Sequence, residues 1–221
     1  MKSVIFDFNG TLLFDSKIHD LAWQLVAKDK LGLNLSLDDI KFYFHGVPNV
    51  IAIEKAKPNY YSENEKIEIS KYKEQVYRNL LTESKMSLVK GSFEFFEYLK
   101  DSNIKFTIAS ASIFTNILFF YKHYKLSNYF DFLHIIYDNG KYVNKVNMFL
   151  DSCLVLDTDI EHSIVFEDSI SGVESAINAG CKNIILIHHN QDIRDFDKYK
   201  EIIFKADNYY DVLSFFKNSI L

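Results

Sequence analysis

The sequence predicts an α/β fold in which a parallel β-sheet lies between two layers of helices. Short apolar runs of four or five residues alternate with amphipathic helical patterns, and turn residues separate them. Such alternation is typical of parallel sheets, whose strands are joined by helical crossovers. A third observation, a long segment with helical periodicity alone, predicts a helical domain inserted into this three-layer core.

Four apolar runs are predicted to form the strands of the core, and a fifth run is a weaker candidate. The four runs are Ser3–Phe6, Lys105–Ala109, Ser163–Phe166 and Asn183–Ile187, and the weaker one is Leu133–Tyr137. Helical patterns separate them at Gly91–Lys100, Ile113–Tyr124 and Gly172–Ala179. In sheets of this kind, ligands bind at the carboxyl ends of the strands, so the residues that follow the runs are candidate site residues.

The segment from about residue 15 to 85 contains no convincing strand. Near its start, apolar residues recur with i, i+3, i+4 spacing, which is typical of an amphipathic helix. Further helices are predicted after Ser36, with two acidic residues in the first turn, and over Glu65–Leu81, behind Ser62. We therefore expect an α/β core of residues 1–14 and 86–221 and a helical cap of residues 15–85 over the active site.

Composition is that of an ordinary globular protein and excludes several classes. The net charge is −5 and no basic block occurs, which argues against nucleic-acid binding. No apolar stretch approaches the roughly 18 residues needed to span a bilayer. The apolar run before Asp7, Val4 to Phe6, is too short for a signal-peptide core. Cys153 and Cys181 match no metal-ligand or redox spacing, which favours buried thiols in a reducing cytoplasm.

Polar residues follow the first two predicted strands. Asp7 ends the first strand and precedes Asn9-Gly10, a turn that would expose its carboxylate as a nucleophile or metal ligand. Ser110, Ala111 and Ser112 follow the second strand, just before a predicted helix. A hydroxyl and backbone N–H groups near a helix N-terminus can hold a phosphate.

Two further segments complete a charged cluster. Lys145 provides a compact positive charge suited to a phosphate and to a carboxylate nucleophile. Glu167 and Asp168 follow another predicted strand and place two carboxylates at its end. Carboxylates are the ligands that a hard cation such as Mg²⁺ prefers, so a magnesium site is expected there.

In this order and at these strand ends, the four segments resemble the four motifs of the haloacid dehalogenase-like (HAD) superfamily. The spacing and the helical insert resemble its β-phosphoglucomutase-like branch, which implies a Rossmann-like core with a cap between the first two motifs. The resemblance covers nearly the whole chain and is most distinctive from Phe166 to Gly180. Similarity to this branch's cap and substrate loop extends to Asp15-Ser16, His19, Trp23 and His45-Gly46-Val47.

The resemblance implies a role for each residue of the first and last motifs. Asp7 attacks phosphorus and becomes transiently phosphorylated. A Mg²⁺ ion is held by Asp7, the backbone carbonyl of Asn9 and Asp168, and Glu167 assists through water. A cation at this position offsets the repulsion between a carboxylate and a phosphate dianion.

The same resemblance implies that Ser110 and Lys145 hold the phosphoryl oxygens. The family's prolines and aspartate after the motif lysine are absent here, where the sequence reads Val-Asn-Met-Phe. Lys141 is therefore an alternative for the motif lysine. Lys145 is favoured because Phe149 and Leu150 then fall in the family's register.

Asn9 is the larger departure from the family pattern, which has a second aspartate two residues after the nucleophile. That aspartate acts as general acid and then as general base. An amide can do neither, although its backbone carbonyl can still serve the metal. Loss of such a group typically costs about 10²- to 10⁴-fold in rate, so turnover is expected to be weak.

His19 and Lys73 in the predicted cap each have two interpretations, and Gly46 has one. His19 either lies on a helix surface or hinge or replaces the missing carboxylate as proton carrier, since imidazole titrates near neutral pH. Lys73 either lies on a solvated helix face, which we favour, or reaches the substrate. Gly46 is expected to contact the substrate, as in the loop that it resembles.

The leading functional hypothesis is a cytoplasmic, Mg²⁺-dependent phosphatase or phosphomutase-like hydrolase of a small phosphorylated metabolite such as a sugar phosphate. The alternative is a non-catalytic descendant that binds a phosphorylated ligand, which Asn9 favours. Phosphonatase or dehalogenase chemistry ranks lower, because a dehalogenase needs no metal and the pair Glu167-Asp168 is intact. Neither nucleic acid nor membrane is an expected partner, and the sequence leaves the choice between monomer and dimer open.

Overall fold

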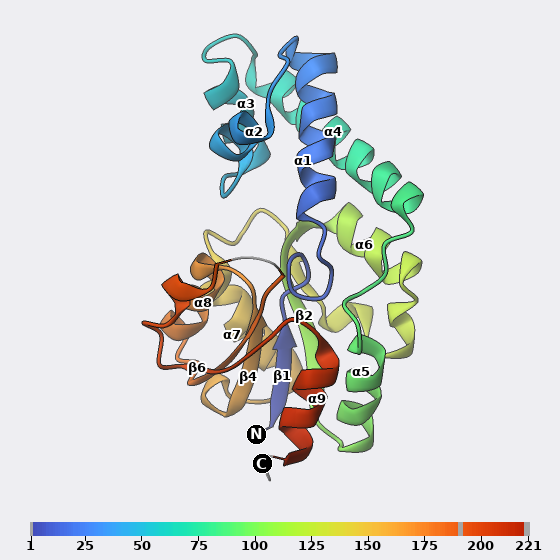
Figure 1. Cartoon of the computed structure of the whole chain (residues 1–221), viewed down its shortest axis with the longest axis vertical. Helices are drawn as coiled ribbons and strands as arrows, with labels where there is room; N and C mark the ends of the chain where they lie inside the picture. Colours follow the sequence, from blue (N-terminus) through green and yellow to red (C-terminus); the bar gives the residue numbers. More distant parts are fainter. Residues whose placement is uncertain (1, 190–191, 219–221) are drawn as a thin grey trace. The chain divides into compact units, whose positions relative to one another are not determined.

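The computed structural model describes residues 2–189 and 192–218 and contains two compact units (Figure 1). The first unit combines the described chain up to Phe14 with the described chain from Ser87 onward. The second unit is the segment Asp15–Met86 between them. The first unit holds a parallel sheet with helices on both faces, which confirms the predicted three-layer α/β core.

Within residues 2–189 and 192–218, the sheet contains six parallel strands in the order β3-β2-β1-β4-β5-β6. Their bounds are β1 Ser3–Phe6, β2 Lys105–Ile113, β3 Ile136–Asp138, β4 Ser163–Glu167, β5 Asn183–Ile187 and β6 Ile202–Ala206. The chain order reverses beside β1, which has β2 on one side and β4 on the other. A crevice for ligands is expected at such a switch point, outside the carboxyl ends of these strands.

Three strand predictions require correction. The second predicted strand, Lys105–Ala109, continues to Ile113, so Ser110, Ala111 and Ser112 lie within β2 and do not follow it. The weaker candidate, Leu133–Tyr137, is divided between a 3₁₀ turn at Phe132–His134 and the short strand β3. The edge strand β6 was not predicted, because its mixed, half-buried residues lack the continuous apolar pattern of the central strands. By contrast, all four residues of β1 are buried, as expected for a strand covered on both faces.

In the described part of the chain, five α-helices flank the sheet. They are α5 Ser92–Asp101, α6 Phe114–His123, α7 Lys145–Leu156, α8 Ile170–Asn178 and α9 Tyr209–Asn218. Short 3₁₀ turns occur at Leu126–Asn128, Phe132–His134, Ile160–His162 and Arg194–Phe196. Successive side chains of a strand point to opposite faces. Accordingly, Ile5 packs in an aliphatic cluster with Phe149 of α7, and Phe6 packs against the aromatic rings of Phe95 and Phe96 of α5.

The second unit is helical throughout, with no strand between residues 15 and 86, all of which are described. Its helices are α1 Ser16–Val26, continued by a π-helical turn at Ala27–Leu31, α2 Leu37–Phe44, α3 Asn49–Ala56 and α4 Glu63–Ser84. Ser36 and Ser62 each begin a helix with a capping box, in which serine and an acidic residue three positions later satisfy each other's backbone N–H groups. The helix α3 was not predicted, and α4 is longer than predicted.

Among the described residues, no helix is both long enough and apolar enough to cross a membrane.

Candidate active site

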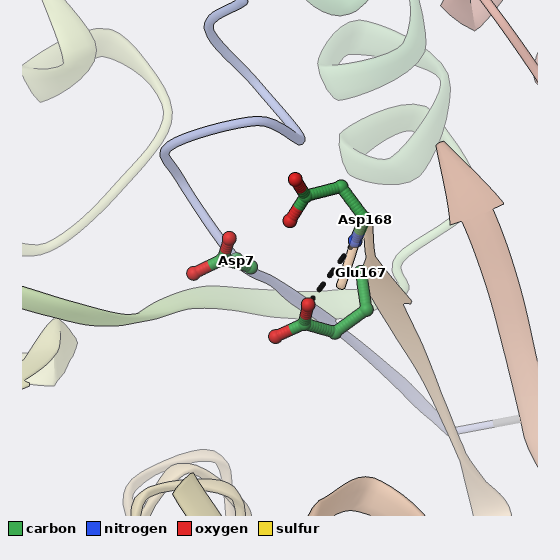
Figure 2. A group of neighbouring side chains, drawn as sticks. All are labelled: Asp7, Glu167 and Asp168. Atoms are coloured by element: carbon green, nitrogen blue, oxygen red, sulfur yellow. Dashed lines mark hydrogen bonds between the residues drawn. The ribbon is translucent and has the colours of Figure 1, made fainter. Parts of the chain in front are cut away.

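Three carboxylates converge at the carboxyl ends of β1 and β4 (Figure 2). The strands pair in register with Phe6 beside Phe166, so Asp7 and Glu167 leave the sheet at the same edge. Together with Asp168, each residue contributes an oxygen atom to a group whose members all lie within 4.8 Å of one another. Asp7 and Glu167 are buried, at 3% and 0% exposure.

Lys145 neutralises part of this charge. It is the first residue of α7, which Asn144 caps by accepting a hydrogen bond from the Val146 N–H. The Lys145 Nζ lies 2.7 Å from Asp7 Oδ1 and 2.5 Å from Glu167 Oε1. Lys141, the alternative, is exposed on the turn that precedes the helix.

Burial and charge oppose each other at these groups. Burial raises the pKa of Asp7 to about 7, the ammonium of Lys145 acts in the opposite direction, and the neighbouring Glu167 adds to the rise. Burial disfavours the charged form of Lys145, but the two carboxylates outweigh it, so the pKa of Lys145 lies above its ordinary value. Lys145 is therefore a permanent positive charge, and Asp7 can lose its proton near neutral pH.

The backbone at the start of α8 holds Glu167. Its Oε2 accepts hydrogen bonds from the N–H of Asp168 at 3.1 Å and from the Ser169 hydroxyl at 3.1 Å, and its Oε1 faces Lys145. Gly172 makes room for this carboxylate, because a Cβ at Gly172 would lie 2.0 Å from Glu167 Cδ. The sequence placed Gly172 in the motif, but it gave no signal that this residue borders the carboxylate.

A second glycine makes room for Asp168. Gly10 has φ of +82°, and a Cβ there would lie 2.0 Å from Asp168 Oδ2. The loop after β1 is tight: the Gly10 N–H donates to the Leu13 carbonyl, and the Leu12 N–H donates to the Phe8 carbonyl. This turn keeps the residues that follow Asp7 close to the end of β4.

The residues after β1 and within β2 are also linked to each other. Ser110 is buried, and its Oγ accepts a hydrogen bond from the N–H of Ser112 at 3.2 Å. The Ser112 hydroxyl donates to Asn9 Oδ1 at 2.7 Å. Ala111 is exposed between the two serines. The contact between Ser112 and Asn9 could not be predicted from the sequence, because the two residues are 103 positions apart.

Two cap candidates, His19 and Lys73, lie in a polar cluster inside the helical unit. His19 Nε2 lies 3.3 Å from Asp15 Oδ2, and Lys73 Nζ lies 2.8 Å from His19 Nδ1. The ring of Tyr77 stacks on His19 at 4.0 Å, and its hydroxyl donates to Asp15. Lys73 is only 2% exposed and contacts Glu74 at 2.9 Å, so the favoured prediction of a solvated lysine is wrong.

Gly46, the third candidate in this unit, is exposed after α2 and has φ of +70°. It follows His45, whose Nε2 lies 2.6 Å from Asp20 Oδ1. This hydrogen bond joins the end of α2 to α1.

The family model for haloacid dehalogenase-like hydrolases matches residues 4–186, which include Asp7, Asn9, Ser110, Lys145, Glu167 and Asp168. The chain belongs to this family. A phosphorylated carbohydrates phosphatase of Thermotoga maritima is 29% identical over 197 residues, which are 86% of this chain and 87% of that protein. The predicted HAD recognition, and with it the prediction of an enzyme, is confirmed.

Solved structures of HAD proteins have the same fold. A family IA, variant 3 HAD hydrolase from Entamoeba histolytica is 34% identical, with a TM-score of 0.88 over 96% of this chain and 95% of that one. A β-phosphoglucomutase from Clostridium difficile is 22% identical, with a TM-score of 0.76 over 100% and 99% of the two chains.

The donor set of this HAD hydrolase fits a hard divalent cation. Asp7 and Asp168 offer carboxylate oxygens, and the main-chain carbonyl of Asn9 lies in the same tight loop. Because Gly10 has no Cβ, the Asp168 carboxylate can lie next to that loop. Glu167, by contrast, already accepts hydrogen bonds at both oxygens, which suits a residue that supports the site.

A surface hollow of the first unit lies away from the carboxylates. A surface cavity of about 620 Å³ opens at the amino end of β2, where Lys105 and Phe106 line it. The Lys105 ammonium there donates to the Leu156 carbonyl at 2.7 Å. Neither Asp7 nor the carboxylates of β4 border this cavity, so it is no part of the candidate active site.

Proposed function

We propose that this HAD hydrolase is a Mg²⁺-dependent phosphatase or phosphomutase-like enzyme that forms a transient aspartyl phosphate on Asp7. The observation that supports this most directly is the position of Lys145, within 2.7 Å of Asp7 Oδ1. The positive charge of an ammonium beside a buried carboxylate offsets the repulsion between that carboxylate and an approaching phosphate dianion. The relative from T. maritima is named for phosphorylated carbohydrates, and a sugar phosphate is therefore the substrate class that we propose.

Asp7 is the nucleophile in this proposal. Its burial and its pKa of about 7 leave a substantial fraction ionised at neutral pH without a full hydration shell. Asp7 Oδ1 faces Lys145, and Oδ2 lies 3.5 Å from the Thr11 hydroxyl. Ser110 and Lys145 would hold the phosphoryl oxygens, with the Ala111 N–H beside them. A Mg²⁺ ion held by Asp7, Asp168 and the Asn9 carbonyl, with support from Glu167, would supply electrostatic stabilisation of the transferring group.

Asn9 limits the proposed reaction. Breaking an alkyl phosphate requires a proton for the leaving alkoxide, and hydrolysis of the aspartyl phosphate requires activation of water. A carboxamide provides neither proton transfer. We therefore expect weak turnover that favours activated substrates, whose leaving groups depart unprotonated.

We also propose that the helical unit is a cap that limits access to the site, and that His19 and Gly46 contribute to substrate binding from it. The substrate is then a small phosphorylated metabolite in the cytoplasm. If the parent protein turned over alkyl phosphates at ordinary rates, His19 would be the first candidate for the missing proton carrier.

The function is tested by a Mg²⁺-dependent screen of phosphorylated metabolites and p-nitrophenyl phosphate with the parent protein and with Asn9→Asp. We expect at least a tenfold gain on alkyl phosphates in Asn9→Asp, and we expect Asp7→Ala to abolish turnover in both backgrounds. Activity that survives Asp7→Ala would contradict the proposed nucleophile.

A non-catalytic phosphate-binding protein is the second candidate, and Asn9 is the observation that favours it. This alternative predicts tight binding of phosphorylated ligands, which calorimetry would detect. It also predicts that neither the parent nor Asn9→Asp turns over any phosphate ester in the panel.

A further inference from the structure

The contact between Ser112 and Asn9 has no part in the reaction as proposed so far. In the sequence, Asn9 stands where the family has an aspartate that acts as general acid and base, and an amide cannot do this. Ser112 is one of the three small residues 110–112 next to the proposed phosphate site. The structure joins them: the Ser112 hydroxyl donates to Asn9 Oδ1 at 2.7 Å. We infer that Ser112 is a positioning residue that fixes which end of the Asn9 carboxamide is turned toward the substrate.

An irregularity in the sheet brings Ser112 to this place. Along β2, Ser110 pairs with Tyr137 of β3, but the next paired residue is Ile113, which lies beside Asp138. Two residues of β2, Ala111 and Ser112, therefore stand opposite a single step of β3. Bulges of this kind re-aim side chains and are common next to active sites.

β2 also extends past the end of β1. Its pairing with β1 ends at Ile108, beside Phe6, so the bulge lies along the loop that contains Asn9. Ser112 is half-buried there. Its backbone N–H is already engaged with Ser110 Oγ at 3.2 Å. The backbone of Ser112 is thus bonded to Ser110, and a chain of hydrogen bonds connects the proposed phosphate ligand Ser110, through Ser112, to Asn9.

The direction of the bond determines what Asn9 presents. A carboxamide has an acceptor oxygen at one end and a donor NH₂ group at the other. Because the oxygen faces the Ser112 hydroxyl, the NH₂ group lies at the opposite end of the amide. An NH₂ group can donate a hydrogen bond to a phosphoryl or leaving-group oxygen, whereas the amide oxygen would repel it. Without Ser112, rotation of the amide by about 180° would no longer be opposed by this bond.

This inference rests on the proposed function, in which an ester oxygen comes close to Asn9. A bond that orients the amide is worth about tenfold in rate, and its effect should depend on how much charge develops on the leaving oxygen. Ser112→Ala should therefore lower kcat about tenfold for an alkyl phosphate and less than about twofold for p-nitrophenyl phosphate. KM and the affinity for inorganic phosphate should not change. Ser112→Thr, which keeps the hydroxyl, should restore kcat.

Three results would overturn the inference. Ser112→Ala could leave both substrates unaffected, it could reduce both equally, or it could weaken the binding of inorganic phosphate, which would make Ser112 a phosphate ligand. The matched control is Ser102→Ala, an exposed serine after α5 at the other end of the strands, which should change nothing.

A measurement without turnover separates this inference from the proposed function. The side-chain amide signal of Asn9 in a ¹H–¹⁵N spectrum can be assigned by its absence in Asn9→Asp. We expect Ser112→Ala to shift or broaden this signal and Ser112→Thr to preserve it. A signal that is unchanged in Ser112→Ala overturns the positioning role, even if the parent protein proves inactive on every ester. Inactivity with a shifted signal would refute the proposed function alone.

Discussion

At the scale of single residues, buried charges around Asp7 distinguish the candidate active site. Asp7 and Glu167 are buried carboxylates that share one ammonium, that of Lys145. Burying like charges together is costly, and such an arrangement is typical of functional sites rather than of structural ones. Lys145 offsets part of this cost and keeps its own charge.

Replacing Asp7 with asparagine should stabilise the metal-free protein at pH 8. The pKa of Asp7 is raised from 3.8 to about 7, chiefly by burial. Between these values, the folded state retains a proton that the unfolded chain releases, so this group's contribution to stability falls as pH rises from about 4 to about 7. Asp7→Asn removes the buried charge, and we expect the Tm to rise by roughly 2–8 °C at pH 8.

Thermal unfolding at pH 5 and pH 8 in the presence of EDTA tests this expectation. The stabilisation by Asp7→Asn should be larger at pH 8 than at pH 5. A Tm that falls at pH 8 would show that the ion pair with Lys145 outweighs the cost of burying Asp7.

The choice between two lysines is also tested at this scale. Lys145 contacts Asp7 and Glu167, whereas Lys141 is exposed. Lys145→Ala should abolish the binding of vanadate, a phosphate analogue, because it removes the proposed counter-charge. Lys141→Ala should bind vanadate within about twofold of the parent by calorimetry, since an exposed charge in water contributes little. The reverse result would reassign the phosphate lysine.

At the scale of secondary-structure elements, the start of α8 both caps the helix and holds the Glu167 carboxylate in place. Ser169 caps the helix by accepting a hydrogen bond from the Gly172 N–H at 3.0 Å, and its hydroxyl also donates to Glu167. One helix start therefore holds a carboxylate of the site. Gly172 permits this arrangement because it has no side chain.

Gly172→Ala should destabilise the protein, although alanine is ordinarily the better helix former by about 1 kcal/mol. The added Cβ would meet Glu167 Cδ at 2.0 Å, and Glu167 is fully buried and cannot move into solvent. We expect a loss of about 1–3 kcal/mol in urea unfolding. Ser171→Ala, on an exposed neighbour in the same helix turn, should change stability by less than about 0.5 kcal/mol. Equal effects of the two substitutions would contradict the steric argument.

In the helical unit, Lys73 is a buried lysine that pairs with a carboxylate, as Lys145 does in the first unit. It contacts Glu74 and His19, and Asn49 of α3 donates to Glu74 at 2.7 Å, so the cluster joins α1, α3 and α4. Lys73→Met keeps the volume but leaves the Glu74 carboxylate buried without its ammonium. Breaking such a pair typically costs about 3–5 kcal/mol.

Urea unfolding measures this cost, and Lys71→Met provides the control. Lys71 is 67% exposed and pairs with the exposed Glu68, and such pairs contribute about 0–1 kcal/mol. If Lys73→Met were no more destabilising than Lys71→Met, the cluster would have no structural importance.

At the scale of the whole molecule, the site depends on segments far apart in sequence that meet only at one edge of the sheet. β1 and β4 are adjacent although about 160 residues separate them, and β2 lies on the other side of β1. Any ligand that binds the folded edge and not the unfolded chain must therefore stabilise the core.

Mg²⁺ should raise the Tm of the protein, by an amount that grows with pH. At a concentration 100 times Kd, the stabilisation is about 2.7 kcal/mol. At pH 6 the ion must displace a proton from Asp7, whose pKa is about 7, whereas at pH 8 that proton is already gone. We expect the Mg²⁺-induced rise in Tm to be larger at pH 8 than at pH 6. Asp168→Ala should abolish the rise at both values, and a rise that persists would exclude Asp168 as a ligand.

The sequence by itself determined the fold class, the family and the order of the site residues. These features follow from local patterns: apolar runs define strands, polar residues after them define strand ends, and parallel strands bring those ends to one edge. Asp7 and the pair Glu167-Asp168 could therefore be placed together without coordinates, and the resemblance to the family added Lys145. The helix start at Ser62 was predicted on equally local grounds.

Tertiary structure alone decided which partners these residues have. The contact of Ser112 with Asn9 depends on a bulge that periodicity does not show, and the room that Gly172 leaves for Glu167 depends on side-chain packing. Lys73 was expected on a solvated helix face, yet it is buried and contacts Glu74. Sequence patterns predict well which faces of helices and strands are buried, because the apolar residues of such faces recur at regular spacing. They do not report polar contacts between distant segments, because each contact depends on the directions of individual side chains in space.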